Sequence, residues 1–365
     1  MADHAGPHRG VPVTTAGADG PRLGDYAPRS RLRVPVTRVE RASVPAVDAH
    51  AHLGRWLTGD WAVRDPRALL ATMDRCNIRA VVNLDGRWGA ELRDNLDRYD
   101  RAFPGRFVTF CHADWSRLRT APGERAGALL ADDLEAAVAA GARGLKVWKD
   151  LGLSVRDGAG RLVLPDDARL WPLWRRAGEL GVPVAVHTAD PMAFFDPPDV
   201  SNERLEELLE HPEWSYAGKG LPTFERLIAA LENVIRAHPG TTFIGVHAGC
   251  CAEDLSVVDR MLATCPNYRI DISARLAELG RQPRRTRALL LRHRGRVLFG
   301  TDEIPPREAA YRMHFRFLET EDEHFPHTEE HPPLRGRWMI SGLGLPPDVL
   351  EEIYAGTARH VIPGL

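Results

Sequence analysis

Four histidines and one aspartate stand at the ends of short apolar runs in this 365-residue sequence. They are His50 and His52 in VDAHAHLG, His187 in VAVHTAD, His247 in FIGVHAG and Asp302 in LFGTDE. His50 and His52 are two residues apart, so in a strand both side chains point to the same side. Burial of these groups without partners would be costly, whereas imidazole and carboxylate are ordinary zinc ligands. One such histidine alone is more often structural, but the set of five predicts a metal site that activates a water molecule.

The elements that carry these residues repeat along the chain. Short runs rich in β-branched residues alternate with amphipathic segments that have helical spacing. Strands that alternate with helices predict parallel βα units, and eight units predict an α/β fold of the (β/α)8 TIM-barrel type. A doubly wound open sheet is the competing fold, but no Gly-rich phosphate loop follows the first run. The runs cover residues 43–54, 78–86, 106–114, 142–150, 181–190, 241–249, 267–275 and 295–303.

Two connections are longer than a loop and a helix require. One lies between His187 and the sixth run, and the other follows Asp302. Both begin at the carboxyl end of a strand, where barrel enzymes build their sites. We therefore expect long insertions after strands 5 and 8, beside the five candidate ligands.

Composition and charge are typical of a globular cytoplasmic protein, and we expect no partner beyond a small-molecule substrate and a possible second copy of the chain. The chain is 44% hydrophobic and 27% charged, which is typical of globular proteins, and its net charge of −2 with no basic block predicts no nucleic-acid or membrane partner. No apolar run approaches the roughly 20 residues of a membrane span. Five cysteines without a CxxC pair predict reduced thiols. We expect residues 1–33 to form a flexible tail, residues 34–365 to form the domain, and a homodimer to be possible.

In combination, VDAHAHLG, VAVHTAD, FIGVHAG and LFGTDE resemble the amidohydrolase superfamily, and specifically its amidohydrolase-related (amidohydrolase 2) branch. The similarity runs from about residue 44 to 361. That branch contains metal-dependent TIM-barrel hydrolases, lactonases and nonoxidative decarboxylases. The resemblance implies that His50, His52, His187 and Asp302 bind the metal, with Asp302 also accepting a proton from the activated water. It implies that His247 is either a further ligand or a catalytic group that polarises the substrate.

Two of the three lysines among the 48 basic residues lie together in GLKVWKDLG, as Lys146 and Lys149. We favour Lys146 as an unmodified catalytic ammonium that contacts a substrate carboxylate or an oxyanion. The resemblance implies an alternative, in which Lys146 is carbamylated and bridges two metals with His247 as an added ligand. Arginine could not do this, because guanidinium stays protonated. Chance survival of two lysines in salt bridges is the third interpretation. Their odd spacing means that at most one points into the barrel, unless the strand bends or ends between them.

Other residues near the predicted metal could contact the substrate or orient the ligands. Arg275 ends the seventh run and could grip an anionic substrate, although an ion pair with a nearby acid is equally consistent with the sequence. We also expect Lys149 and Trp148 to contact the substrate. Asp190 and Glu303 follow the motif histidine and aspartate closely, so they could orient the histidine ligands.

Two reactions fit this set of residues. The first is hydrolysis of an amide, lactone or related C–N or C–O bond, in which activated water attacks and Asp302 moves the proton. The second is nonoxidative decarboxylation of an aromatic or unsaturated acid, in which Arg275 or a lysine would grip the carboxylate. A barrel that has the fold but no catalytic activity is the third and least favoured interpretation. The ligand types suit Zn²⁺, which we expect, and also Mn²⁺, Fe²⁺ or Co²⁺.

Overall fold

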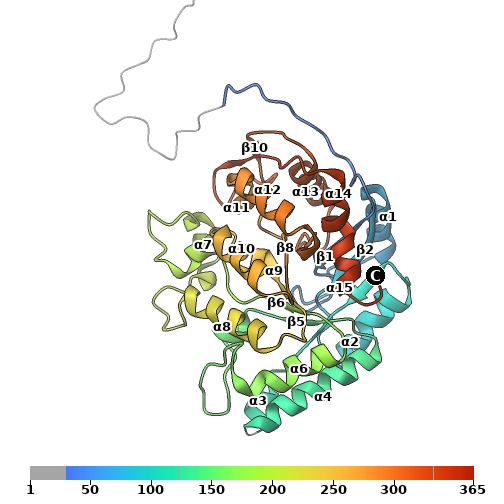
Figure 1. Ribbon diagram of the computed structural model, residues 1–365, viewed down its shortest axis with the longest axis vertical. Helices are drawn as coiled ribbons and strands as arrows, with labels where there is room; N and C mark the ends of the chain where they lie inside the picture. Colours follow the sequence, from blue (N-terminus) through green and yellow to red (C-terminus); the bar gives the residue numbers. More distant parts are fainter. Residues whose placement is uncertain (1–29, 122, 332) are drawn as a thin grey trace, which may run out of the picture. The chain divides into compact units, whose positions relative to one another are not determined.

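A parallel barrel forms the centre of the computed structural model, which describes residues 30–121, 123–331 and 333–365 (Figure 1). Residues 35–365 form one compact unit. The predicted tail, residues 1–33, lies almost entirely outside the described residues, so its flexibility stays a prediction. No helix among the described residues has both the length and the apolar character that a membrane crossing needs.

Each of the eight predicted runs contains a strand. Parallel pairing joins the three strands β1, β2 and β3 in one sheet and the six strands from β4 through β9, in that order, in a second. Two backbone bonds continue the barrel where these sheets meet, from Phe110 N to Asn83 O and from Ala49 N to Phe299 O, both at 2.9 Å. The α/β TIM barrel that the alternation predicts is therefore confirmed. The strands are β1 (Ala46–Ala51), β2 (Ile78–Asn83), β3 (Phe107–Thr109), β4 (Cys111–His112), β5 (Leu145–Val147), β6 (Val184–Val186), β7 (Phe243–Gly245), β8 (Tyr268–Asp271) and β9 (Val297–Leu298).

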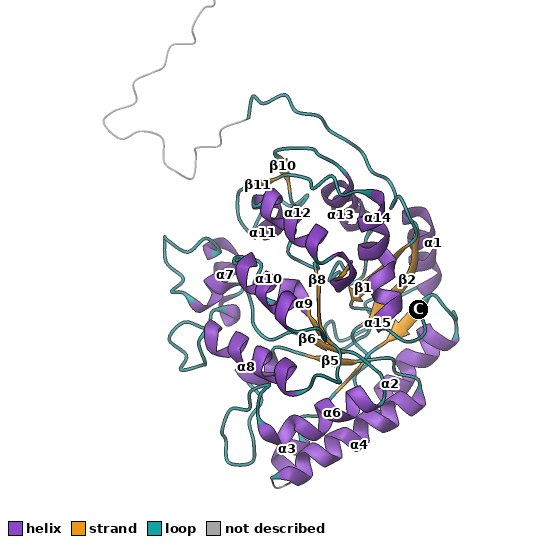
Figure 2. Cartoon of the chain, in the orientation of Figure 1, coloured by secondary structure: helices purple, strands orange, loops and turns teal. Residues whose placement is uncertain are grey.

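Helices surround the strands (Figure 2). They form for local reasons that α8 illustrates: the hydroxyl of Thr223 accepts the amide of Arg226 at its start, and Leu227, Leu231 and Val234 recur at helical spacing on its buried face. The helices are α1 (Pro66–Cys76), α2 (Gly89–Asn95), α3 (Arg117–Thr120), α4 (Glu124–Ala140), α5 (Asp150–Leu153), α6 (Trp171–Glu179), α7 (Leu205–Glu210), α8 (Phe224–Ala237), α9 (Val246–Gly249), α10 (Leu255–Thr264), α11 (Leu276–Arg281), α12 (Pro283–Arg292), α13 (Glu308–Glu319), α14 (Pro347–Glu351) and α15 (Thr357–Val361).

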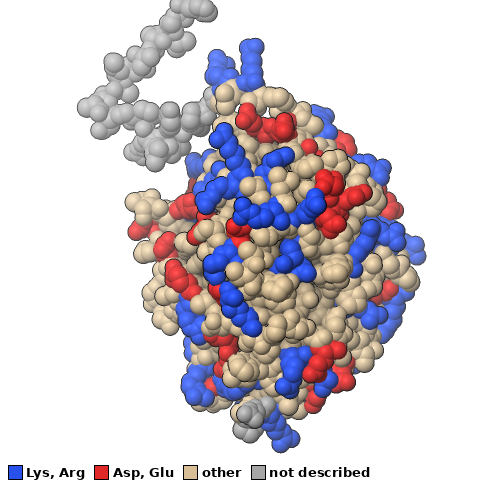
Figure 3. Space-filling model, in the orientation of Figure 1, with Lys and Arg blue, Asp and Glu red and all other residues tan. Residues whose placement is uncertain are grey.

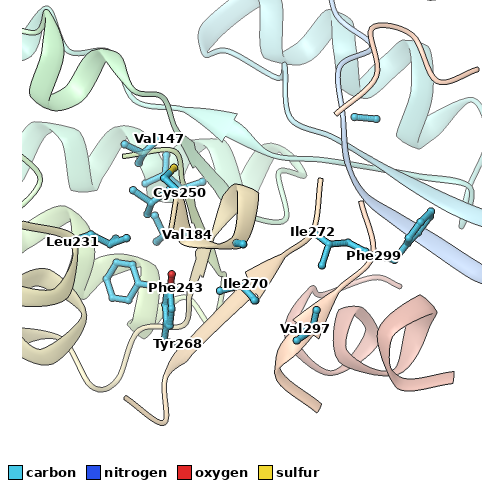
Figure 4. Close-up of a cluster of buried hydrophobic side chains, with 14 of the residues drawn as sticks. Val147, Val184, Leu231, Phe243, Cys250, Tyr268, Ile270, Ile272, Val297 and Phe299 are labelled. Atoms are coloured by element: carbon cyan, nitrogen blue, oxygen red, sulfur yellow. The ribbon is translucent and has the colours of Figure 1, made fainter. Parts of the chain in front are cut away.

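Two apolar cores hold the barrel. The outer core lies between strands and helices, and Figure 4 shows part of it, with Val184, Phe243 and Ile270 from successive strands and Leu231 from α8. The inner core gathers residues from strands on opposite sides, which can meet only inside the barrel. Its strand residues are Val47, Ala49, Ala80, Val82, Val108, Ala185, Ile244 and Leu298. Because strand side chains alternate, the position two residues after Ala185 also faces inward, and that residue is His187.

The two predicted insertions follow β6 and β9, the fifth and eighth barrel strands, and contact each other. The first carries α7, and the second carries α13 and the antiparallel pair β10 (Phe325–Pro326) and β11 (Met339–Ile340). Arg204 of the first insertion is only 2% exposed and pairs with Glu207 and with Glu278 of α11. Arg337 of the second insertion pairs with Glu206 of the first. On the molecular face in Figure 3, basic and acidic side chains are intermingled.

Candidate metal centre

His50, His52 and Asp302 meet at the carboxyl end of the barrel. The Nε2 atoms of His50 and His52 lie 3.1 and 3.0 Å from the same atom, Oδ1 of Asp302. All three side chains offer ligand atoms within 4.8 Å of one another. The Asp302 amide donates to His50 O at 2.7 Å, which fixes the turn after β9 against β1.

Two further aspartates orient the imidazoles. Nδ1 of His50 lies 2.8 Å from Oδ2 of Asp271, and Nδ1 of His52 lies 2.7 Å from Oδ1 of Asp85. A carboxylate that accepts from Nδ1–H leaves the lone pair on Nε2, which is the arrangement usual for histidines that bind metals. Both Nε2 atoms then face the Asp302 carboxylate, and Nε2 of His50 has no hydrogen-bond partner. Lone pairs this close to a carboxylate oxygen require positive charge, so these residues fit a divalent cation.

The pKa values at this centre also indicate that its atoms require positive charge. Burial opposes the charge on His52, but the carboxylates of Asp85 and Asp302 raise its pKa to about 9. Burial likewise opposes the charge on Asp302, but His50 and His247 bring its pKa well below the usual value. Without a metal, a proton on His52 would supply the positive charge that this group of atoms requires.

His247 lies beside this group on an unusual stretch of backbone. His247, Ala248, Gly249 and Cys250 all have φ between 56 and 64°, so the element labelled α9 ends in a left-handed turn. The His247 amide donates to Oδ1 of Asp271 at 2.8 Å, while its Nε2 lies 3.9 Å from Oδ2 of Asp302. His247, His50 and Asp271 form a second group with ligand atoms within 4.8 Å. Burial lowers the pKa of His247 well below its usual value, so the ring is neutral near pH 7.

His187 is adjacent to this centre but stands outside both groups of ligand atoms. Its ring centroid lies 4.6 Å from that of His247 and 6.0 Å from that of Trp148. Its Nε2 lies 3.4 Å from Oδ1 of Asp190 and has no hydrogen-bond partner. Burial lowers the pKa of His187 to about 4 although Asp190 opposes this. That His187 binds a metal therefore stays a prediction.

The fourth barrel strand ends between the two lysines, with Lys146 on β5 and Lys149 at the start of α5. Lys146 is 1% exposed on β5, and its Nζ lies 5.2 Å from the ring centroid of Trp148, without a hydrogen-bond partner. Burial lowers its pKa, although Asp302 and Asp271 oppose this. Trp148 in turn packs against the metal centre, since its ring centroid lies 5.3 Å from that of His52.

Lys149 and Arg275 have partners of their own. Lys149 donates through Nζ to Oδ2 of Asp190 and lies over the ring of Trp214. Arg275 is buried and donates through Nη1 to the carbonyl of Ala274 at 2.8 Å. It also lies close enough to His247 for its charge to lower the pKa of that ring. Substrate contacts by Lys149, Arg275 and Trp148 stay predictions.

The acids that orient histidines differ in part from those expected. Asp190 lies beside His187 as predicted, whereas Glu303 accepts a hydrogen bond from Arg307 at 2.7 Å. Asp85 and Asp271, which bond the two β1 histidines, were not predicted. Their signals were the polar residues that follow apolar ones in NLDG and IDIS, at the ends of the second and seventh runs.

Comparison with known proteins agrees with this geometry. Residues 47–363 match the protein family described as Amidohydrolase. No curated protein sequence matches the chain. Among solved structures, 2,6-dihydroxybenzoate decarboxylase from Rhizobium superimposes with a TM-score of 0.55 at 16% identity, over 87% of this chain and 98% of that one.

Two other solved structures have similar folds. A dihydroxybenzoic acid decarboxylase from Polaromonas sp. JS666, with bound manganese and the inhibitor 2-nitroresorcinol, has a TM-score of 0.54 at 15% identity, over 87% of this chain and 96% of that one. An uncharacterised TIM-barrel protein from Bordetella bronchiseptica has a TM-score of 0.52 at 14% identity, over 87% and 97%. At these identities the structures support the barrel fold alone. Because the family match spans most of the sequence, this chain belongs to the amidohydrolase family.

Proposed function

We propose that this protein is a metal-dependent nonoxidative decarboxylase that acts on an aromatic or other unsaturated acid. Metal dependence is supported by the convergence of His50, His52 and Asp302 and by the carboxylates on the far nitrogens of both histidines. The structural likeness to two dihydroxybenzoate decarboxylases agrees with this choice of reaction. For the metal we propose Zn²⁺, with Mn²⁺ as the first alternative because manganese is bound in the Polaromonas structure.

The observation that carries the choice of substrate is the environment of Lys146. Its amino group is buried next to the metal centre and has no hydrogen-bond partner among the described residues. A buried amine without an acceptor destabilises the free enzyme, whereas a bound carboxylate would accept from Nζ and favour its charged form. A neutral amide or lactone would compensate this group less well. We therefore assign Lys146 to the carboxylate of an acidic substrate.

The remaining residues would move the proton that decarboxylation requires. When bound, a divalent cation would supply a Lewis acid that attracts the substrate's oxygen atoms. As the C–C bond to the carboxylate breaks, its electron pair stays on the substrate carbon, which must then take up a proton. Because the pKa values of Asp302 and His247 are both lowered, this proton would come from a water molecule, whose hydroxide would leave with the CO₂ as bicarbonate. Oδ2 of Asp302 and Nε2 of His247, which lie 3.9 Å apart, would pass it to the carbon. Ser273 holds the other ring nitrogen of His247 through its carbonyl and hydroxyl oxygens, each at 3.0 Å.

Hydrolysis is the second candidate, and the same lysine gives it a role. In attack on a carbonyl, Lys146 would stabilise the developing oxyanion, and Asp302 would accept the proton of the attacking water. The family description, Amidohydrolase, favours this candidate.

A product assay separates the two reactions. The enzyme would be purified without chelators, its metal content measured, and each batch incubated with hydroxybenzoates and unsaturated acids or with lactones and amides. We expect about one divalent metal per chain and CO₂ release from at least one acid. Acid release from a lactone or amide without CO₂ from any acid would establish hydrolysis instead. Protein that binds no divalent metal would overturn both.

A further inference from the structure

A cavity of about 620 Å³ lies at the ends of β2, β4 and β5, and Trp148 connects its wall to His52 of the metal centre. Lys146, which is buried on β5, also lines this cavity. Four of the nine tryptophans in the chain line it: Trp56, Trp88, Trp115 and Trp148. Such a concentration of indole rings gives the cavity flat apolar walls that suit a planar ring.

The aromatic wall is continuous from the metal centre outward. The Trp148 ring packs on His52 and, at a centroid distance of 4.6 Å, on Trp56. Trp56 in turn packs on His112 at 5.3 Å and under the guanidinium of Arg87 at 4.9 Å. A planar substrate that lies along these rings would therefore have one end near Trp148 and Lys146 and the other near Arg87.

Three nitrogen atoms of residues that line this cavity are buried and have no hydrogen-bond partner in the part of the chain that the structure describes: Nζ of Lys146, Nε1 of Trp148 and Nε of Arg87. The indole and guanidinium nitrogens can only donate, and a charged Lys146 also only donates. An unsatisfied buried donor destabilises a folded protein, so three around one cavity require an explanation. A ligand with several acceptor oxygens would satisfy them.

Arg87 is held in place for such a ligand. Its guanidinium lies 3.9 Å from the ring centroid of Trp88 and stacks on Trp56, yet no carboxylate lies within ion-pair distance of it among the described residues. Its backbone has φ of 57°, which is uncommon for a residue with a side chain, and its carbonyl accepts from the His112 amide at 2.8 Å. Strained backbone of this kind is concentrated at functional sites.

Cationic side chains outnumber carboxylates around the cavity. Four cationic side chains line it, against two carboxylates, Asp114 and Asp150. The cationic residues are Arg87, Arg119, Lys146 and Arg156. A single carboxylate bound at Lys146 would leave Arg87 without a direct ion pair, although Glu91, Asp150, Asp114 and Asp85 act on its charge from farther away. His112 stands between these two cations, and the charge of each acts on its ring.

We propose that this cavity binds a planar dianion, with one acid group at Lys146 beside the metal centre and a second, separate acid group at Arg87. The inference rests on the proposed function only in assigning the first carboxylate to the reacting end. Arg87 is then the residue that selects a diacid over a monoacid, through an ion pair formed on a stacked and partly dehydrated guanidinium.

Equilibrium binding tests this without turnover. The metal-loaded protein would be titrated with benzene-1,4-dicarboxylate, naphthalene-2,6-dicarboxylate and benzoate, and affinity read from tryptophan fluorescence and calorimetry. We expect at least one diacid to bind at least tenfold more tightly than benzoate. Arg87→Gln should remove that preference while leaving benzoate affinity unchanged. Arg93→Gln, at an exposed position of α2, is the matched control and should keep the preference.

A second variant guards against misfolding. Arg87→Gly also removes the guanidinium, but glycine adopts φ of 57° without strain, so this variant should fold. Equal affinity for both diacids and benzoate in the wild type, or a diacid preference that survives both Arg87 variants, would overturn the inference. Diacid selectivity that depends on Arg87 in a protein that decarboxylates no acid would support the inference and refute only the proposed reaction.

Discussion

The metal centre and the cavity beside it differ in whether the protein itself supplies hydrogen-bond partners for their side-chain nitrogen atoms. At the centre, Nδ1 of His50 and Nδ1 of His52 each bond a buried carboxylate, so the chain itself fixes both rings. In the cavity, nitrogen donors of Lys146, Trp148 and Arg87 have no partner. The histidine rings at the centre are therefore oriented without substrate, whereas the donors in the cavity gain hydrogen-bond partners only when a ligand binds.

This difference suggests how the two regions divide the work. A site that must hold a cation in one geometry benefits from ligands whose orientation is fixed in advance. A site that must recognise an anion benefits from donors that are worth little until the anion arrives. Substitutions should therefore have different effects in the two regions: at the centre they should weaken metal binding, and in the cavity they should weaken ligand binding without loss of fold.

The largest effect is expected for Asp302→Asn. The amide keeps the size of the carboxylate but cannot accept or deliver the proton, so we expect turnover to fall by about a thousandfold or more. His50 and His52 remain, so part of the bound metal should be retained in elemental analysis. Asp259→Asn, at a surface ion pair with Arg292, is the control and should be fully active. Full activity of the Asp302 variant would contradict the role given to this carboxylate.

Next in size is the effect of Asp85→Asn on metal affinity. This change removes the charge that faces Nδ1 of His52, and loss of such a partner typically weakens metal binding by about 10- to 100-fold. Competition with a fluorescent chelator would measure the change. Asp133→Asn, which alters only an exposed pair with Arg117, should leave the affinity as it is. Unchanged affinity in the Asp85 variant would show that the chain does not orient His52 through this bond.

How far the sequence alone reaches can be judged from these residues. The strands and the metal-ligand candidates stand out because inward-facing positions at strand ends, such as His187, are polar where apolar residues would pack. Asp271 does not stand out as the partner of His50, because 221 residues separate the two and their meeting depends on barrel closure. Arg87 escaped notice in a chain rich in arginine. Only the structure shows that its guanidinium lies between two indole rings without a carboxylate.

His112, which lines the cavity, should make the stability of the protein depend on pH. Burial is the main reason that the pKa of His112 is about 3, with Nε2 bonded to the Leu84 carbonyl at 2.6 Å. The unfolded chain binds a proton near pH 6.5, so stability is lost as pH falls from about 6.5 towards 3, by up to about 1.4 kcal/mol per pH unit. Urea unfolding at pH 7, 6 and 5 should show a smaller loss for His112→Gln than for the wild type. Parallel pH profiles for the two proteins would contradict a neutral His112.

The smallest effect separates the two lysines. Lys146→Met replaces a buried amine that has no partner with an apolar chain of similar length, so we expect the free energy of unfolding to rise by about 1 kcal/mol while acid binding is lost. Lys149→Met is the matched change at a lysine bonded to buried Asp190, and it should lower stability. Chemical unfolding of the apo proteins would measure both. Destabilisation by Lys146→Met would indicate that Lys146 has a partner within the protein.

In the left-handed turn from His247 to Cys250, substitutions to glycine should be tolerated better than substitutions of glycine by a residue with a side chain. Glycine at position 248 would accept φ of 56° more easily than alanine, so Ala248→Gly should relax the turn. The reverse change one residue later is blocked, since a Cβ atom at Gly249 would lie 2.2 Å from the Tyr268 hydroxyl. Libraries built around this loop should therefore recover variants with added glycine at position 248 and lose those with a side chain at 249.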